Sequence, residues 1–273
     1  MSEATRIAST FSALKSADRM AFMPFIAAGD PDVATTAKIL RELASAGADL
    51  IEIGFPYSDP IADGPVIQAS YTRALSKQVK LKEIFEMLSS VSGEISAPLV
   101  GMVSYAIIFR YGTENFVKQA RSSGLAGLIV PDLPGDEAAT FAAMMANEKL
   151  DLIQLIAPTT PPERAVKILQ RATGFVYCIA VSGTTGVRKE LAPHLADMLK
   201  SLRSQTNLPL AVGFGISGPD QIEHLRGKAD GVIVGSAIVK LLEPLSVAGT
   251  DTTSVIRSVG DFTRSLAKAA HRE

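Results

Sequence analysis

The chain has 273 residues, of which 47% are hydrophobic and 20% are charged, with a formal net charge of −1 at pH 7. This composition supports a sizeable buried core and excludes a disordered chain. No basic run occurs, which argues against nucleic acid as the main partner. One cysteine, Cys178, excludes an internal disulfide and is expected to be buried by packing.

No apolar run is long enough to span a bilayer, so we expect no membrane partner. The first residues, 1–6, lack the basic flank and apolar stretch of a signal peptide. The sequence therefore predicts a cytoplasmic protein.

Short apolar runs alternate with longer amphipathic runs along the chain. The runs predicted to be strands are 21–27, 49–54, 98–103, 127–130, 151–156, 175–180, 209–213 and 231–235. The runs predicted to be helices are 7–15, 34–46, 81–88, 115–122, 136–148, 161–172, 194–204, 219–225 and 252–270. Strands that are apolar on both faces are typical of a parallel sheet covered by helices.

Eight strand–helix units in one uninterrupted series predict a (β/α)8 TIM barrel, with an extra N-terminal helix at 7–15. No linker rich in Pro, Ser or Gly divides the chain, so we expect a single domain over residues 1–273. The alternative is an open doubly wound sheet. It lacks support because no G-x-G-x-x-G follows an early strand.

Glu52 lies within the second predicted strand, between Ile51 and Ile53. Alternation of side chains along a strand directs both isoleucines outward and Glu52 into the barrel. Partial desolvation there raises the pKa of a carboxyl group, which suits a group that transfers protons near neutral pH. The alternative is a structural carboxylate satisfied by backbone donors.

Two further carboxylates, Asp59 and Asp63, lie on the loop that follows this strand. Asp59 precedes a proline and reads as a turn residue. Asp63 lies between Ala62 and Gly64, whose small size allows a ligand to approach. A metal site would be another use of these acids, but no histidine lies near them, and we predict no metal ligand.

Three late strand–helix turns are rich in glycine: 181–188, 213–217 and 235–236. Glycine allows backbone N–H groups to approach phosphate oxygens closely. The Ser236 hydroxyl and the N-terminus of a further helix predicted to begin there add donors. Their position after the sixth, seventh and eighth strands is typical of the phosphate site of TIM barrels. The polar loop 182–191 is predicted to close as a lid, which would bring Thr185 towards Asp63.

Residues 52–68, EIGFPYSDPIADGPVIQ, resemble the signature of the tryptophan synthase alpha subunit family. Supporting matches span essentially the whole chain, at 23–31, 131–134, 213–216 and 230–237. The resemblance implies a lyase that cleaves indole-3-glycerol phosphate to indole and glyceraldehyde 3-phosphate. The acid–base groups and the phosphate turns deduced above agree with such a reaction.

The resemblance also implies roles for individual residues. Glu52 protonates C3 of the indole ring and helps to remove the glycerol hydroxyl proton, while Asp63 accepts a hydrogen bond from the indole N–H. Tyr177 lies beside Glu52. The residues that match indole-contacting positions are Phe25, Met102, Ile129 and Leu155, and those that match phosphate binders are Gly186, Gly215, Gly235 and Ser236.

Members of this family pair with a beta subunit in an α2β2 complex, and indole passes to that subunit through a tunnel. The resemblance therefore implies no cofactor in this chain and pyridoxal phosphate in the beta subunit. Two departures stand out: Ala106 and Ile107 replace a common Asn-Pro, and Ala180-Val181 replace a common Ser-Arg. The first departure leaves open a free-standing lyase without a beta partner.

The same motifs disfavour two other functions. One is a barrel that only activates a partner, which the intact Glu52 and Asp63 disfavour. The other is a different phosphate-binding barrel, such as a sugar-phosphate isomerase, which the 52–68 motif disfavours.

Overall fold

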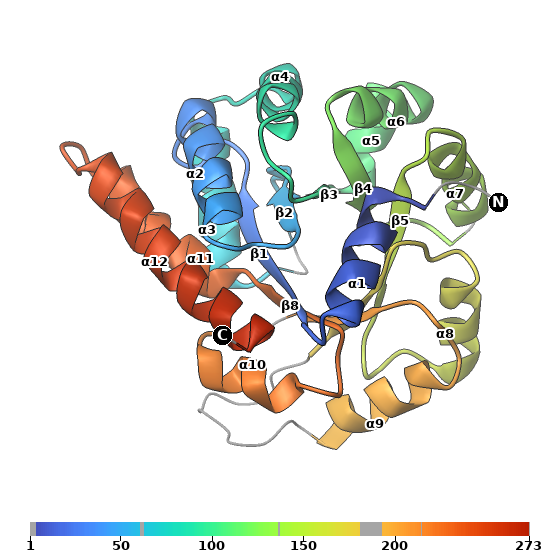
Figure 1. The fold of residues 1–273 in the computed structure, drawn as a ribbon. Coiled ribbons are helices and arrows are strands. Elements are labelled where there is room, and N and C mark those ends of the chain that lie inside the picture. The colour runs from blue at the N-terminus through green and yellow to red at the C-terminus, as the bar shows by residue number, and fades with distance from the viewer. Residues whose placement is uncertain (1–3, 61–62, 136, 181–192, 214, 273) are drawn as a thin grey trace.

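Eight parallel strands close into a barrel in the order of the sequence (Figure 1). The computed structural model describes residues 4–60, 63–135, 137–180, 193–213 and 215–272, without the side chains of 193 and 194. The strands are β1 (Ala21–Ala27), β2 (Ile51–Gly54), β3 (Leu99–Met102), β4 (Leu125–Ile129), β5 (Asp151–Ile156), β6 (Val176–Ile179), β7 (Leu210–Gly213) and β8 (Gly231–Val234). Because β1 pairs with both β2 and β8, the TIM-barrel prediction is confirmed and the open sheet is excluded.

Helices surround this barrel and follow the predicted series closely. They are α1 (Arg6–Ser16), α2 (Val33–Ser45), α3 (Pro65–Ser76), α4 (Leu81–Ser92), α5 (Tyr105–Tyr111), α6 (Thr113–Ser122), α7 (Ala138–Asn147), α8 (Pro162–Leu169), α9 (Pro193–Arg203), α10 (Pro219–Leu225), α11 (Ser236–Leu242), the 3-10 turn η1 (Glu243–Ser246) and α12 (Thr252–His271). Two of them, α3 and α5, were not predicted. Pro65 begins α3 with a backbone already suited to a first turn, and the Ser104 hydroxyl accepts the N–H of Ala106 to begin α5.

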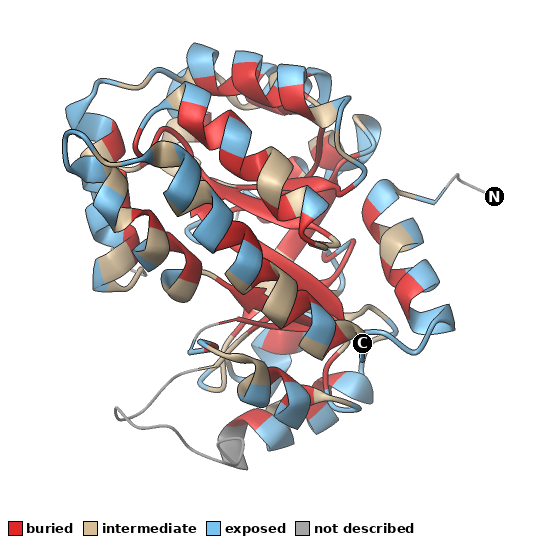
Figure 2. Cartoon of the chain, turned by 60° about the vertical axis from the view of Figure 1, so that its left-hand side comes forward, coloured by how far each residue is buried: buried red, intermediate tan, exposed pale blue. Residues whose placement is uncertain are grey.

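The apolar residues form two layers on either side of the strands. Ile51 and Ile53 pack outward against the helices, in the largest cluster of buried side chains. Val100, Ile153 and Ile233 pack inside the barrel. Figure 2 shows the consequence, with buried strands at the centre and exposed residues on the outer faces of the helices and on the loops. Glu52, between the two outward isoleucines, therefore lies on the inward row, as predicted.

The N-terminal helix α1 packs onto the interior of the barrel. Its buried side chains Ile7, Phe11 and Leu14 belong to the inner cluster together with Leu50 and Phe175, which lie at the start of their strands. The ring centroids of Phe11 and Phe175 are 5.6 Å apart. The predicted extra helix thus closes the amino-terminal end of the barrel.

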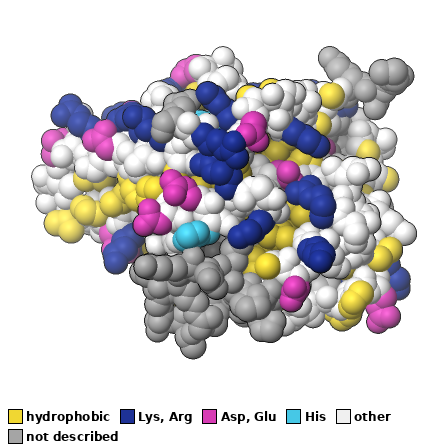
Figure 3. Space-filling model, turned by 60° about the horizontal axis from the view of Figure 1, so that its bottom comes forward, with side chains coloured by type: hydrophobic (Ala, Val, Ile, Leu, Met, Phe, Trp, Pro, Cys, Tyr) yellow, Lys and Arg dark blue, Asp and Glu magenta, His cyan; other side chains and the backbone are white. Residues whose placement is uncertain are grey.

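Cys178 is buried in β6, and burial raises the pKa of its thiol to about 12. The group therefore stays protonated and serves packing, as predicted. On the face seen in Figure 3, acidic and basic side chains are mixed, in keeping with the small net charge. Of the helices in the described part of the chain, none has the length and apolar character needed to cross a membrane.

Candidate active site

A cavity of about 400 Å³ lies at the carboxyl ends of the strands. Most of the residues predicted to form the site line it: Phe25, Glu52, Asp63, Met102, Tyr177, Gly215, Gly235 and Ser236. They come from β1, β2, β3, β6 and the turns after β2, β7 and β8. The barrel thus gathers into one cavity groups that are up to 211 residues apart in the sequence, from Phe25 to Ser236.

Glu52 lies at the floor of this cavity, paired in register with Phe25 of β1 and Val100 of β3. Only 4% of its surface is exposed, and its Oε1 accepts no hydrogen bond from any described residue. Burial raises the pKa of Glu52 to about 8, and the nearby Asp63 carboxylate adds to the rise. At neutral pH the group is therefore mainly protonated and able to donate a proton.

Asp63 lies on the loop between β2 and α3, at the edge of the same cavity. Its backbone is held on both sides: its N–H donates to the Pro60 carbonyl at 3.0 Å, and its carbonyl accepts from Gln68 Nε2 at 2.7 Å. Burial raises the pKa of Asp63 to about 6, which leaves this carboxylate mainly ionised at neutral pH. Two neighbouring carboxyl groups thus occupy opposite protonation states, a pattern typical of acid–base sites.

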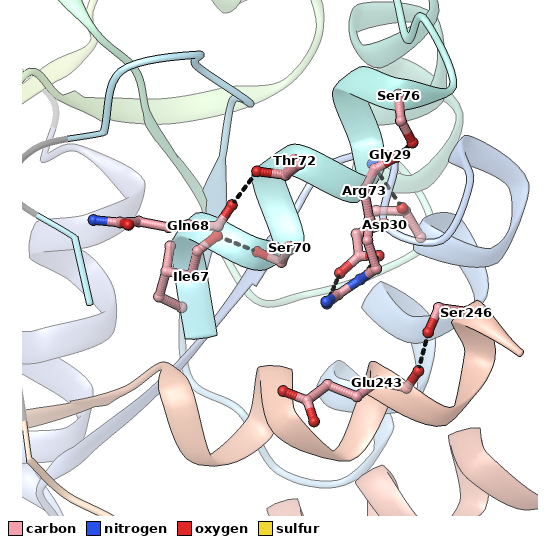
Figure 4. Close-up of polar contacts among 11 residues, drawn as sticks. Gly29, Asp30, Ile67, Gln68, Ser70, Thr72, Arg73, Ser76, Glu243 and Ser246 are labelled. Carbon is pink, nitrogen blue, oxygen red and sulfur yellow. Dashed lines mark hydrogen bonds and ion pairs between the residues drawn. The ribbon is translucent and has the colours of Figure 1, made fainter. Parts of the chain in front are cut away.

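An ion pair fixes α3, the helix that follows this loop. Arg73 Nε and Nη2 donate to Asp30 Oδ1 and Oδ2, at 2.9 and 2.6 Å. Asp30 lies in the turn after β1 and is 3% exposed, so the pair ties α3 to the barrel (Figure 4). This bidentate contact holds the position from which α3 presents its side chains to the cavity.

Two tyrosines lie beside the carboxyl pair, and sequence reasoning found only one of them. Tyr177 of β6 fits its hydroxyl against Gly213 of β7, where a Cβ would lie 2.4 Å from the oxygen. Tyr71 of α3 does the same against Gly54 of β2, at 2.3 Å. Burial together with the nearby carboxylates raises the pKa of both phenols well above 10, so both stay protonated.

The part of the lining that follows β7 and β8 is suited to an anion. Gly215, with a φ of +81°, turns the chain after β7, and Gln221 holds this turn by accepting from the Ser217 N–H and donating to the Gly215 carbonyl. Gly235 and Ser236 begin α11, whose first N–H groups have no partner within the helix. Lys240, which the sequence analysis missed, is the one cationic side chain in the described lining. Its spacing of four from Ser236 was the available signal, since residues i and i+4 share a helix face.

Two predicted pocket residues are not among the residues that line this cavity. Ile129 is fully buried inside the barrel, and Leu155 packs against the same inner cluster, beside the lining residues Met102 and Tyr177 in the strand register. Thr185, Gly186 and the predicted lid 182–191 lie outside the described residues. Within the described ranges, no group of three or more His, Cys, Asp or Glu side chains could hold a metal ion.

Comparison with known proteins places this chain in a family. Residues 11–271 match the family model described as tryptophan synthase alpha chain. The tryptophan synthase alpha chain of Microcystis aeruginosa is 45% identical over 266 residues, which cover 97% of this chain and 99% of the relative. That of Synechocystis is 46% identical, covering 96% and 98%.

Solved structures support the same family assignment. Tryptophan synthase subunit alpha from Legionella pneumophila superposes with a TM-score of 0.89 at 32% identity, covering 99% of this chain and 100% of that one. A chain of tryptophan synthase from M. tuberculosis in an aminoacrylate-bound form gives 0.86 at 29% identity, covering 98% and 100%. The chain belongs to the tryptophan synthase alpha chain family.

Proposed function

We propose that this chain cleaves indole-3-glycerol phosphate to indole and glyceraldehyde 3-phosphate by a retro-aldol reaction. One observation carries the proposal. A single cavity is lined by a protonated Glu52, an ionised Asp63 and, from α11 and the turn before it, Gly235, Ser236 and Lys240. A substrate that carries both an indole ring and a phosphate fits this combination of groups.

In the first step, the Glu52 carboxyl group donates its proton to C3 of the indole ring, which leaves a positively charged indoleninium. The resulting Glu52 carboxylate then accepts the proton of the glycerol hydroxyl next to the scissile bond. As that O–H bond breaks, the carbonyl forms, the carbon–carbon bond cleaves and its electron pair returns to the ring. Glu52 ends protonated, ready for another turnover.

Asp63 stabilises the charge that develops between these steps. Its pKa of about 6 keeps it ionised at neutral pH, so it accepts a hydrogen bond from the ring N–H as positive charge grows there. The Glu52 proton matters for the same reason, since two ionised carboxylates this close repel each other. The pair is therefore suited to the cationic intermediate more than to the neutral substrate.

The phosphate binds at the glycine turns after β7 and β8. The amide groups at Gly215 and Gly235 and the Ser236 hydroxyl are suited to its oxygens, and Lys240 supplies positive charge. The carboxyl pair lies elsewhere on the lining, so the phosphate fixes which end of the substrate reaches Glu52.

We further propose that the chain acts with a pyridoxal phosphate-containing beta subunit, as an α2β2 complex in the cytoplasm. Helix α5 presents a surface suited to binding a partner. Asp132 accepts a hydrogen bond from Ser104 Oγ at 2.6 Å and holds the first turn of this helix, while the apolar side chain of Phe109 is 69% exposed. Ala106 and Ile107 lie on the same helix. A free-standing lyase is the alternative.

The closed barrel also supports one domain over residues 1–273.

Indole release from indole-3-glycerol phosphate, measured with and without a beta chain, tests this function. We expect turnover by the chain alone and faster turnover with the partner. Turnover that a beta chain neither binds nor accelerates would favour the free-standing lyase. Absence of indole under both conditions would contradict the proposed reaction.

The carboxyl pair predicts a bell-shaped pH dependence of kcat/KM. Activity rises through pH 6 as Asp63, with a pKa of about 6, becomes ionised, and falls through pH 8 as Glu52, with a pKa of about 8, loses its proton. The maximum therefore lies near pH 7, about midway between the two pKa values. A profile that stays flat from pH 7 to above pH 9 would contradict the role of protonated Glu52.

A further inference from the structure

Tyr71 is a buried phenol at the candidate site that the mechanism above does not use. It lies on α3 and is 3% exposed, packed with Phe25, Ile67 and Val239 around the cavity wall. The family motif used in the sequence analysis ends at residue 68 and does not include it. Its hydroxyl nevertheless points at the strand that carries Glu52, as its contact with Gly54 shows.

The glycine at position 54 fixes where this hydroxyl lies. A Cβ on Gly54 would be 2.3 Å from Tyr71 Oη and 2.6 Å from Phe25 Cζ, so the phenol oxygen occupies the place of the missing side chain. Gly54 and Glu52 are two residues apart, on the same inward row of β2. Tyr71 Oη therefore lies next to Glu52 along the barrel interior.

The electrostatics of the phenol agree with this placement. Burial raises the pKa of the Tyr71 hydroxyl, and the carboxylates of Asp63 and Glu52 both act on it and add to the rise, so the phenol lies within reach of both groups. Glu52 Oε1 is a buried acceptor without a donor among the described residues.

We propose that Tyr71 is a positioning residue for the reaction: its hydroxyl donates a hydrogen bond to the Glu52 carboxylate formed after the first proton transfer. This contact directs the carboxylate along β2, towards the substrate, for the second proton transfer. The role rests on the proposed function, because it concerns the proton that Glu52 gives and takes back. A neutral phenol is suited to it, since it donates without adding charge.

The other groups that face Glu52 leave this role to Tyr71. Asp63, on the loop before α3, is an acceptor when ionised and cannot donate to a carboxylate. Tyr177, from β6, also lies near Glu52, but its hydroxyl rests against Gly213 of β7 and so approaches from a different strand, and not along β2. Lys240, from α11, is the cation of the lining, and the neighbouring residues Phe25 and Val100 on β1 and β3 are apolar.

The variant Tyr71→Phe removes only the hydroxyl and tests this directly. We expect kcat to fall about tenfold or more, as for loss of a hydrogen bond to a charged group, with KM nearly unchanged. Because the lost bond stabilised the ionised form, the pKa of Glu52 should rise by about one unit, and the alkaline limb of the pH profile should move up with it. Tyr111→Phe is the matched control, since this tyrosine is 38% exposed on α5 and does not line the cavity.

A second measurement separates this inference from the proposed function. The pKa of Glu52 can be read by ¹³C NMR of the side-chain carboxyl carbons in the full chain, with the Glu52 signal assigned by its loss in Glu52→Gln. If wild-type protein releases no indole, the proposed reaction fails, and this titration still decides whether Tyr71 contacts Glu52. An unchanged Glu52 pKa in Tyr71→Phe overturns the inference, even if activity or thermal stability falls.

Discussion

Glu52→Gln is expected to lower kcat for indole release by about 10³-fold or more, at the upper part of the range for loss of a general acid–base group. Glutamine has nearly the same shape, but it cannot give a proton to C3 or take one from the hydroxyl. Steady-state turnover of indole-3-glycerol phosphate measures this effect. KM should change little, because the phosphate end of the cavity, at Gly235 and Ser236, is untouched.

The stability of the same variant provides the control. Folding raises the pKa of Glu52 from an ordinary 4.5 to about 8. The protonated form is therefore favoured in the folded chain, and the stability it contributes is lost as the pH rises from 4.5 through 8. A neutral glutamine escapes this loss, so Glu52→Gln should unfold at the same or a higher temperature than wild type at pH 8. Near-normal turnover by a well-folded variant would contradict the acid–base role.

Asp63→Asn is expected to reduce kcat by about 10²- to 10³-fold, the loss typical of removing one group that stabilises charge in a transition state. The amide keeps the size of the side chain but no longer offers a negative charge to the ring N–H. Single-turnover measurements isolate the chemical step. The residual activity should also lose the rise through pH 6, because the group responsible for that limb is gone.

Asp59→Asn is the matched control for that measurement. This residue lies on the same loop, is exposed and does not line the cavity. Its replacement should leave the chemical step and the acid limb unchanged. Equal losses in the two variants would mean that the loop's conformation, and not the charge of Asp63, limits the reaction.

The period of the hydrophobic pattern and the spacing of the apolar runs along the chain were sufficient to predict the barrel and the inward direction of the Glu52 side chain. Both follow from local rules, since a strand alternates its faces and parallel strands need helices between them. Helix α5 was missed because Ile107, Ile108 and Phe109 form an unbroken apolar run without a polar face. Its identity as a helix depends on Asp132, 27 residues from the Tyr105 N–H that donates to it.

The site residues that were missed depend on contacts between elements. Tyr71 lies beside the carboxyl pair because Arg73 and Asp30 fix α3, and because position 54 of another element lacks a side chain. Neither condition can be read from the helix itself. Lys240 was closer to prediction, since it shares a helix face with Ser236. Ile129 and Leu155, which match indole positions in the family, pack in the inner cluster and are not among the lining residues.

The helix beneath the barrel has a consequence for how reactants travel. With Phe11 of α1 packed against Phe175, the described residues close the amino-terminal end of the barrel, so reactants reach the reaction chamber from its carboxyl-terminal end. The substrate must then enter, and both products must leave, through this same end of the barrel, one after another. Any protein that docks over this end would control substrate entry and product release together, without contacting a reacting atom.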